Sequence, residues 1–175
     1  MFIIMVKKVV GSKATISGKT FDEVRKNLLH RTMILKGRIT QKYEDLYRRS
    51  SMDHVRYVLK ELRSEEEEDT TFIKNALESG EIPIKPSTEP DMKNFEMLDH
   101  IIRDAGNETN PNDLKSVLLA AIKTTDELHN IFEIMSSEYG TSSISDLMRG
   151  LAQHEMSKKE RLSELYDDMV NKDYW

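Results

Sequence analysis

Apolar residues recur at helical spacing along four long stretches of the chain, separated by polar, glycine-containing or proline-containing segments. Capping residues stand at the start of each stretch, namely Thr20, Ser50, Asn110 and Ser143, and Pro111 is expected at the first helical position of the third. The pattern therefore predicts four long helices, over about residues 20–49, 53–80, 111–140 and 143–171.

The lengths of the connections predict how these helices are arranged. The turns at 50–53 and 140–143 are short, so the first and second helices, and the third and fourth, are expected to be antiparallel neighbours. The connection over 81–110 is long, and an amphipathic piece at 91–105 predicts a short fifth helix within it. Residues 1–19 are expected to form an N-terminal arm or short strand, hairpin-like towards its end. The predicted fold is an all-α four-helix bundle of two antiparallel hairpins, 20–80 and 111–171, joined by a long crossover.

The two hairpins align with each other at a constant shift of 89 residues, without a gap. The shift pairs Tyr43 with Phe132 and Leu62 with Leu151, and many other apolar positions agree in the same way. Any two amphipathic helices share a period, but one shift that aligns both helix pairs across a turn is a stricter condition. The sequence therefore indicates an internal duplication.

Every helix carries an apolar stripe, and polar residues interrupt all four stripes at the same level. In the fourth helix, for example, the stripe is expected to run from Ile144 to Leu165. We call the interrupting set the charged layer. It consists of Lys36, Glu66, Asp69, Thr125, Glu155 and Lys158. The neighbouring acids Glu65, Glu67 and Glu68 are expected on a solvated face instead.

The charged layer requires a physical explanation, because burying a charge costs several kcal/mol unless it is paired or bound to a cation. The 89-residue shift pairs Lys36 with Thr125, Glu66 with Glu155 and Asp69 with Lys158, so the polar positions repeat although their chemistry does not. Two explanations remain open from the residues alone: a bound metal or an internal network of ion pairs.

Composition narrows the classes of function. The net charge of −5 offers no general attraction for nucleic acid or an anionic membrane surface, so neither is an expected partner. The absence of cysteine excludes disulfides, thiolate metal sites and thiol catalysis, and it favours a cytoplasmic location. The opening apolar run ends at Lys7 and is too short for a signal peptide or a membrane span.

The segment Leu151-Ala152-Gln153-His154-Glu155-Met156-Ser157-Lys158, continued to Leu162, resembles the Leu-Ala-Glu-Glu-Glu-x-x-His-x-x-x-Leu helix of ferritin-like proteins, in particular the rubrerythrin-like group. The run from Leu62 to Asp69 is its counterpart in the first hairpin, and the resemblance covers about residues 20–170. It implies a four-helix bundle whose di-iron site takes a Glu from each of two helices and a Glu-x-x-His from each of the other two.

This chain departs from that ligand set at four of six positions. It has Lys36 and Thr125 where the resemblance implies Glu, and Asp69 and Lys158 where it implies His. Two divalent cations need several carboxylates and neutral imidazoles, and an ammonium group repels them. A di-iron site cannot be carried over, and the rubredoxin-type iron site of rubrerythrin itself is excluded by the absence of cysteine.

Two functions remain. In the first, Lys36 and Lys158 replace the metal ions, no cofactor is bound, and the bundle acts as a structural or interaction protein. The second keeps one iron or manganese ion on Glu66, Asp69 and Glu155, with Thr125 or His129 as a further ligand, and makes the chain a non-haem metal oxidoreductase. A homodimer is the expected assembly, formed through the 91–105 segment or the N-terminal arm.

Overall fold

The computed structural model describes residues 15–16, 19–79, 109–138 and 143–172. Within these ranges the chain forms four helices, α1 (Phe21–Arg49), α2 (Asp53–Ser79), α4 (Leu114–Glu138) and α5 (Ser143–Lys172). They are preceded by the two-residue strands β1 (Thr15–Ile16) and β2 (Lys19–Thr20), which pair antiparallel as a small hairpin. Apart from this small hairpin the described residues form helices, so the all-α class is confirmed, and the helix bounds follow the sequence prediction closely. The expected crossover and fifth helix lie almost wholly outside the described residues, as do the first fourteen residues of the arm.

The start of α4 differs from the prediction. Pro111 is not the first helical residue, because Asn110 opens a separate turn in which its carbonyl accepts a hydrogen bond from the Asp113 amide (3.2 Å). The Asp113 carboxylate then accepts a hydrogen bond from the Lys115 amide (3.1 Å). A carboxylate that satisfies an amide of the first turn is the usual helix N-cap, so Asp113 performs the role predicted for Asn110.

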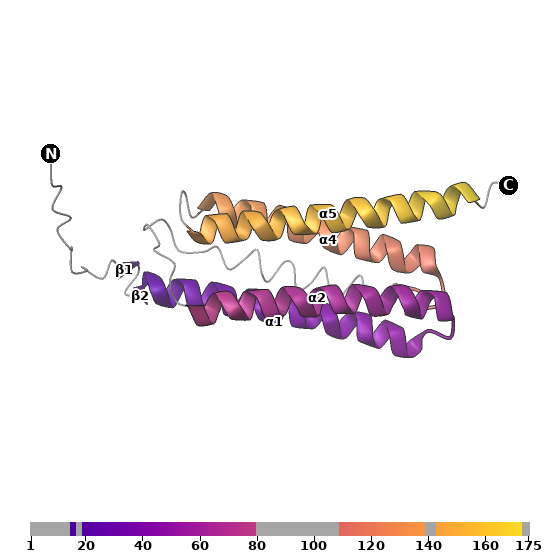
Figure 1. The fold of residues 1–175 in the computed structure, drawn as a ribbon, viewed down its shortest axis with the longest axis horizontal. Helices are drawn as coiled ribbons and strands as arrows, with labels where there is room; N and C mark the ends of the chain where they lie inside the picture. Colours follow the sequence, from indigo (N-terminus) through magenta and orange to yellow (C-terminus); the bar gives the residue numbers. More distant parts are fainter. Residues whose placement is uncertain (1–14, 17–18, 80–108, 139–142, 173–175) are drawn as a thin grey trace, which may run out of the picture.

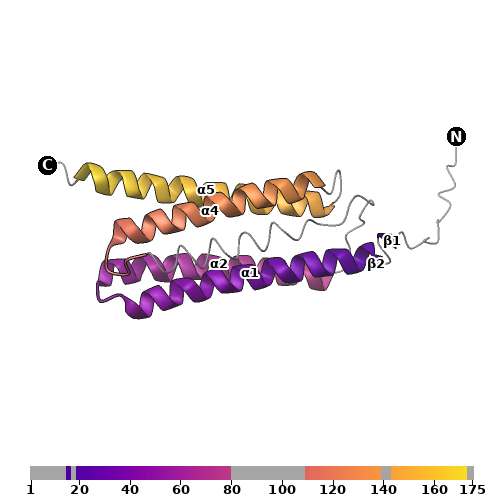
Figure 2. The same ribbon diagram turned by 180° about the vertical axis from the view of Figure 1, so that it is seen from behind.

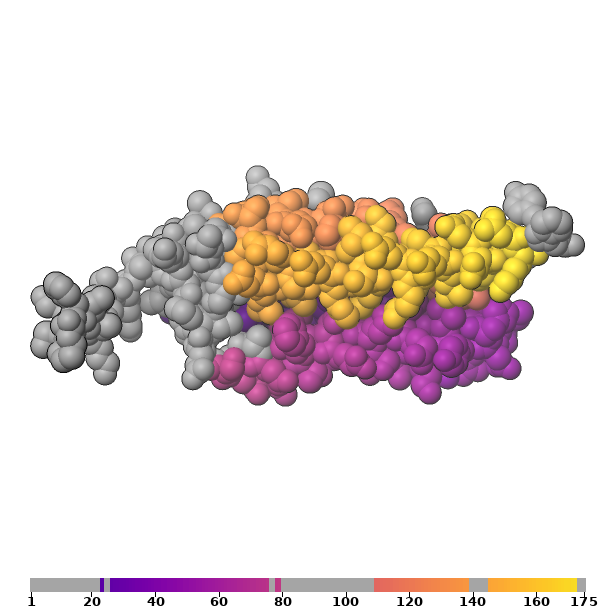
Figure 3. Space-filling view, turned by 45° about the horizontal axis from the view of Figure 1, so that its top comes forward, coloured from indigo at the N-terminus to yellow at the C-terminus, as the bar shows by residue number. Residues whose placement is uncertain are grey.

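The helices lie lengthwise as two antiparallel hairpins, α1 with α2 and α4 with α5 (Figures 1 and 2). The space-filling view shows α2 and α5 meeting along one face of the molecule (Figure 3). Ion pairs from α5 to α2, and from α1 to α5, join the two hairpins. The described part of the chain is thus a four-helix arrangement, and none of its helices is both long enough and apolar enough to cross a membrane.

The core is built from the apolar stripes. Positions related by the 89-residue shift are buried together, as Tyr43 and Phe132 are, and as Leu62 and Leu151 are. Such burial is what a duplication requires, although the duplication itself stays a prediction. The predicted apolar stripe of the last helix is wrong at its end. Leu165 is 39% exposed, whereas Tyr166 and Met169 pack against the core. A straight helix has 3.6 residues per turn, so a 3.5-residue stripe drifts off the buried face.

Candidate functional site

The charged layer lies inside the bundle, and each of its six residues is at most 6% exposed. Lys36 comes from α1, Glu66 and Asp69 from α2, Thr125 from α4, and Glu155 and Lys158 from α5. Within α2 and within α5 the two residues are three apart, so both face the same way. The helical stripes therefore bring residues from all four helices to one level.

The ammonium group of Lys36 contacts all three buried carboxylates. Its Nζ donates a hydrogen bond to Asp69 Oδ2 (2.8 Å), forms an ion pair and hydrogen bond with Glu155 Oε1, and lies 2.9 Å from Glu66 Oε2. The ring of Phe132 covers the same nitrogen at 5.9 Å from the ring centroid. Lys36, at 0% exposure, is thus completely enclosed by acidic and aromatic groups.

Lys158 binds the same carboxylates from α5. Its Nζ donates hydrogen bonds to Glu66 Oε1 (2.9 Å) and Asp69 Oδ2 (2.7 Å), and it lies 3.7 Å from Glu155 Oε1. Glu66 therefore bridges the two ammonium groups with its two different oxygens, while Asp69 bridges them with one. Thr125 takes no part in this network, because its hydroxyl donates to the Ile122 carbonyl of its own helix (2.9 Å).

Three carboxylates face two ammonium groups, so the layer carries one negative charge in excess when all five groups are ionised. Burial by itself lowers the pKa of both lysines, but the surrounding carboxylates, Glu66 first among them, outweigh burial and hold both pKa values above 10.5. Both lysines therefore carry a positive charge at neutral pH.

The carboxylates differ from one another. Burial opposes ionisation of Asp69, yet the two lysines overcome it and leave the pKa of Asp69 below its ordinary value. For Glu155 burial prevails, reinforced by the nearby Glu66 carboxylate, and its pKa is raised. The Oε2 atom of Glu155 is also buried without a hydrogen-bond partner in the described part of the chain. Glu155 is therefore the group at which the excess charge is least well compensated.

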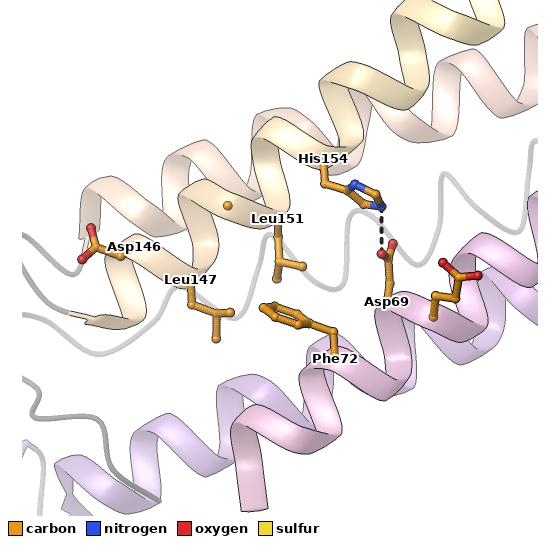
Figure 4. A pocket seen from close by; sticks show the side chains of 8 residues that line it. Asp69, Phe72, Asp146, Leu147, Leu151 and His154 are labelled. Carbon is orange, nitrogen blue, oxygen red and sulfur yellow. Dashed lines mark ion pairs between the residues drawn. The ribbon is translucent and has the colours of Figure 1, made fainter. Parts of the chain in front are cut away.

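His154 joins the network from its edge, which the sequence did not indicate. Its Nε2 lies 3.0 Å from Asp69 Oδ1, the oxygen that does not contact the lysines, and its side chain is 51% exposed (Figure 4). A chain of polar contacts therefore runs from solvent through His154 and Asp69 to both lysines. The only sequence signal for this role is that His154 directly precedes Glu155, which is too weak to separate it from a surface histidine.

His129, a candidate ligand from the sequence, does not join the carboxylates. Its Nδ1 is hydrogen-bonded to the Ala152 carbonyl (2.9 Å). Among the described residues, the oxygens of Glu66, Asp69 and Glu155 lie within 4.8 Å of one another, and His129 is not part of that group. Three converging carboxylates are a familiar donor set for iron or manganese.

The same oxygens, however, already contact two ammonium groups at hydrogen-bond distances. A divalent cation placed among them would lie next to two positive charges, and it would have fewer carboxylates than two metal ions need. The residues present therefore do not fit a di-iron centre.

No protein-family model matches the chain, no curated protein matches it, and no solved structure does.

Proposed function

We propose that this chain is a ferritin-like bundle of the rubrerythrin-like type in which Lys36 and Lys158 take the places of two metal ions, and that it acts as a structural or interaction protein without a cofactor. The homodimer expected from the sequence belongs to the same proposal. The 91–105 segment, one of the two segments expected to form the dimer contact, lies outside the described residues. Sedimentation of the purified chain tests the assembly, and a monomer alone would contradict it.

The observation that carries the proposal is the bridging arrangement. Glu66 contacts one ammonium nitrogen with Oε2 and the other with Oε1, each at 2.9 Å. Asp69 Oδ2 contacts both nitrogens, at 2.8 and 2.7 Å. Bridging carboxylates contact two cations in the same two ways in dinuclear metal sites. This bridging arrangement supports the proposal that an ammonium group occupies each cation position.

Charge balance supports the same interpretation. Two divalent ions bring four positive charges, which suits the four carboxylates of the ferritin-like ligand set. Here only three carboxylates converge, and two lysines bring two positive charges. The smaller number of carboxylates thus goes with a smaller positive charge, and one negative charge remains in excess.

Elemental analysis of the purified native chain tests the proposal. Protein prepared from cells supplied with iron, manganese and zinc should contain none of them in stoichiometric amount. About one tightly held transition metal per chain would overturn the proposal.

A gain-of-function variant gives a second test. Lys36→Glu combined with Lys158→His restores the residue types that the resemblance implies at these positions, and it removes both ammonium groups. We expect this variant to bind manganese or iron(II), and its thermal midpoint to rise with metal concentration. Lys60→Glu with Lys74→His makes the same exchanges at exposed positions of α2 and should show no such rise. Equal metal response in the two variants would count against lysine as the substitute for metal.

The convergence of three carboxylates within 4.8 Å favours one alternative, a single iron or manganese ion on Glu66, Asp69 and Glu155 in a non-haem oxidoreductase. This alternative predicts turnover of peroxide or oxygen that depends on added metal and disappears with a chelator. It also requires one of the two buried ammonium groups to lose its proton when the metal binds. Because binding then releases a proton, metal affinity should weaken as pH falls.

A further inference from the structure

A pocket of about 420 Å³ opens between α2 and α5, directly beside the charged layer. Its wall on α5 is one helical stripe, and its wall on α2 is the stripe that faces it (Figure 4). Cavities of this size, from about 300 to 1,000 Å³, commonly hold small molecules. The lining residues are Glu68, Asp69, Phe72, Asp146, Leu147, Gly150, Leu151 and His154.

The middle of the pocket is apolar and open. Phe72 projects from α2 towards Leu147 and Leu151 of α5, and it remains 55% exposed (Figure 4). Gly150 adds to the space, because a Cβ placed there would meet no atom within 4 Å. A large aromatic side chain therefore borders a cavity that the described residues leave unfilled.

The polar lining is almost wholly acidic. Glu68, Asp69 and Asp146 contribute carboxylates, and the lining residues that the structure describes include neither lysine nor arginine. Asp69 is neutralised from behind by the two lysines of the charged layer, and Asp146 pairs with Arg149 at 3.3 Å. Glu68 has no ion pair among the described residues. The uncompensated negative charge of the pocket therefore lies at Glu68, four residues before Phe72 on the same helix face.

We propose that this pocket binds a small amphiphilic organic cation, a primary ammonium group carried on an aromatic or alkyl body. The ammonium group lies next to the Glu68 carboxylate and over the edge of the pocket, and the body packs against Phe72, Leu147 and Leu151. An anionic ligand of the same shape would meet the uncompensated Glu68 carboxylate and should bind more weakly.

The pocket shares only Asp69 with the charged layer, and the ligand is proposed to contact Glu68, Phe72, Leu147 and Leu151 instead, so this proposal does not depend on the proposed function. Metal content and ligand binding are separate measurements, and either proposal can fail while the other stands.

Three probes of one shape test the charge preference: 2-phenylethylamine, 2-phenylethanol and phenylacetate, titrated into the full chain while the Leu147 and Leu151 methyl signals are followed by NMR. We expect saturable shifts with the amine, at an affinity at least about tenfold above that for phenylacetate, with the alcohol between them. Absence of saturable shifts with all three probes overturns the proposal. Equal or tighter binding of phenylacetate overturns the assignment of a cation.

Two pairs of variants locate the site. Glu68→Gln should lower amine affinity about threefold to fivefold, the effect of one exposed ion pair, while leaving the affinity for the alcohol unchanged. The matched control is Glu67→Gln, an exposed acid of the same run that does not line the pocket, and it should leave both affinities unchanged.

Gly150→Leu should fill the pocket and abolish binding of both the amine and the alcohol. Gly37→Leu is its control, since Gly37 is also an exposed helical glycine with open space at Cβ but lies on α1, away from the pocket. Circular dichroism should show both variants folded. Unchanged amine affinity in Gly150→Leu would overturn the placement of the site.

Discussion

The substitution Lys36→Met tests directly whether the charged layer is an ion-pair network on which the bundle depends. Methionine nearly matches the length of the lysine side chain but removes the ammonium group, so packing changes little while charge changes by one. Three carboxylates would then face only Lys158, and the excess of negative charge would rise from one to two. Glu155 would lose most, because its Oε1 pairs with Lys36 whereas Lys158 lies 3.7 Å away.

The expected loss is large. Lys36 is 0% exposed and contacts three carboxylates, two of which are at most 3% exposed. Removing one partner of a buried pair costs about 3–5 kcal/mol, because the remaining charge stays buried without compensation. In a protein of this size each kcal/mol lowers the thermal midpoint by about 2–4 °C, so the midpoint should fall by roughly 6–20 °C.

Urea denaturation followed by circular dichroism measures the free energy of unfolding, and calorimetry gives the midpoint. Lys60→Met removes an exposed lysine from α2 and should change the free energy of unfolding by less than about 0.5 kcal/mol. The double variant Lys36→Met with Glu155→Gln removes one charge of each sign and should recover part of the loss. A loss below about 1 kcal/mol in Lys36→Met, with an unchanged denaturant slope, would refute the network as described.

Three further predictions concern the charged layer and the two exposed helical glycines. The pKa of Glu155 is raised and that of Asp69 is lowered. At pH 7 Glu155→Gln should therefore change the free energy of unfolding by less than about 1 kcal/mol, whereas Asp69→Asn should cost about 2–4 kcal/mol. A larger loss in Glu155→Gln than in Asp69→Asn would contradict this. The two lysines of the layer have pKa values raised above 10.5 in the folded protein. Their contribution to stability is therefore complete below that pH and should be lost as pH rises through the pKa values of the folded state. A series of thermal midpoints measured at increasing pH would show this loss. Gly37→Ala and Gly150→Ala should each stabilise the chain by about 0.5–1 kcal/mol in urea denaturation, because an added Cβ meets no neighbour; destabilisation by either would mean that the space is occupied.

Much of this arrangement could be predicted from the sequence. Apolar residues repeat with the helical period, so the positions that must face the core are fixed by spacing alone. A charged residue at such a position, as Lys36 and Glu155 are, must be buried whenever the helix forms and packs. When four such helices pack together through short turns, these positions meet at one level. The buried charged layer could therefore be predicted from the spacing alone, without distances.

Other features depend on geometry that spacing does not encode. His154 reaches Asp69 because α5 faces α2 across the boundary between the hairpins. A residue beside an apolar stripe can lie either in solvent or at that boundary, and the spacing does not distinguish the two. Conversely, His129 shares a helix face with Thr125 but finds a hydrogen bond to the Ala152 carbonyl instead. The pocket could not be predicted from the sequence either, since it arises from the distance between two helices and from the absence of a side chain at Gly150.

The position of the ion pairs indicates what the charged layer contributes to the fold. Within each hairpin a short turn already fixes the alignment of the two helices, but no short connection fixes one hairpin against the other. Apolar stripes that repeat every three or four residues would allow the hairpins to slide by one turn at modest cost, because leucine can replace leucine as a neighbour. The contacts of Lys36 with Glu155, and of Lys158 with Glu66 and Asp69, all cross between the hairpins. A slide of one turn, about 5.4 Å, would break these three contacts. Lys36 would keep Glu66 and Asp69 of its own hairpin, but Glu155 would lose Lys36 and Lys158 would lose both carboxylates of α2, which leaves buried charge poorly compensated. Whatever ligand the bundle binds, the layer therefore selects one alignment of the hairpins, a role that two metal ions bound between the same helices would also fulfil.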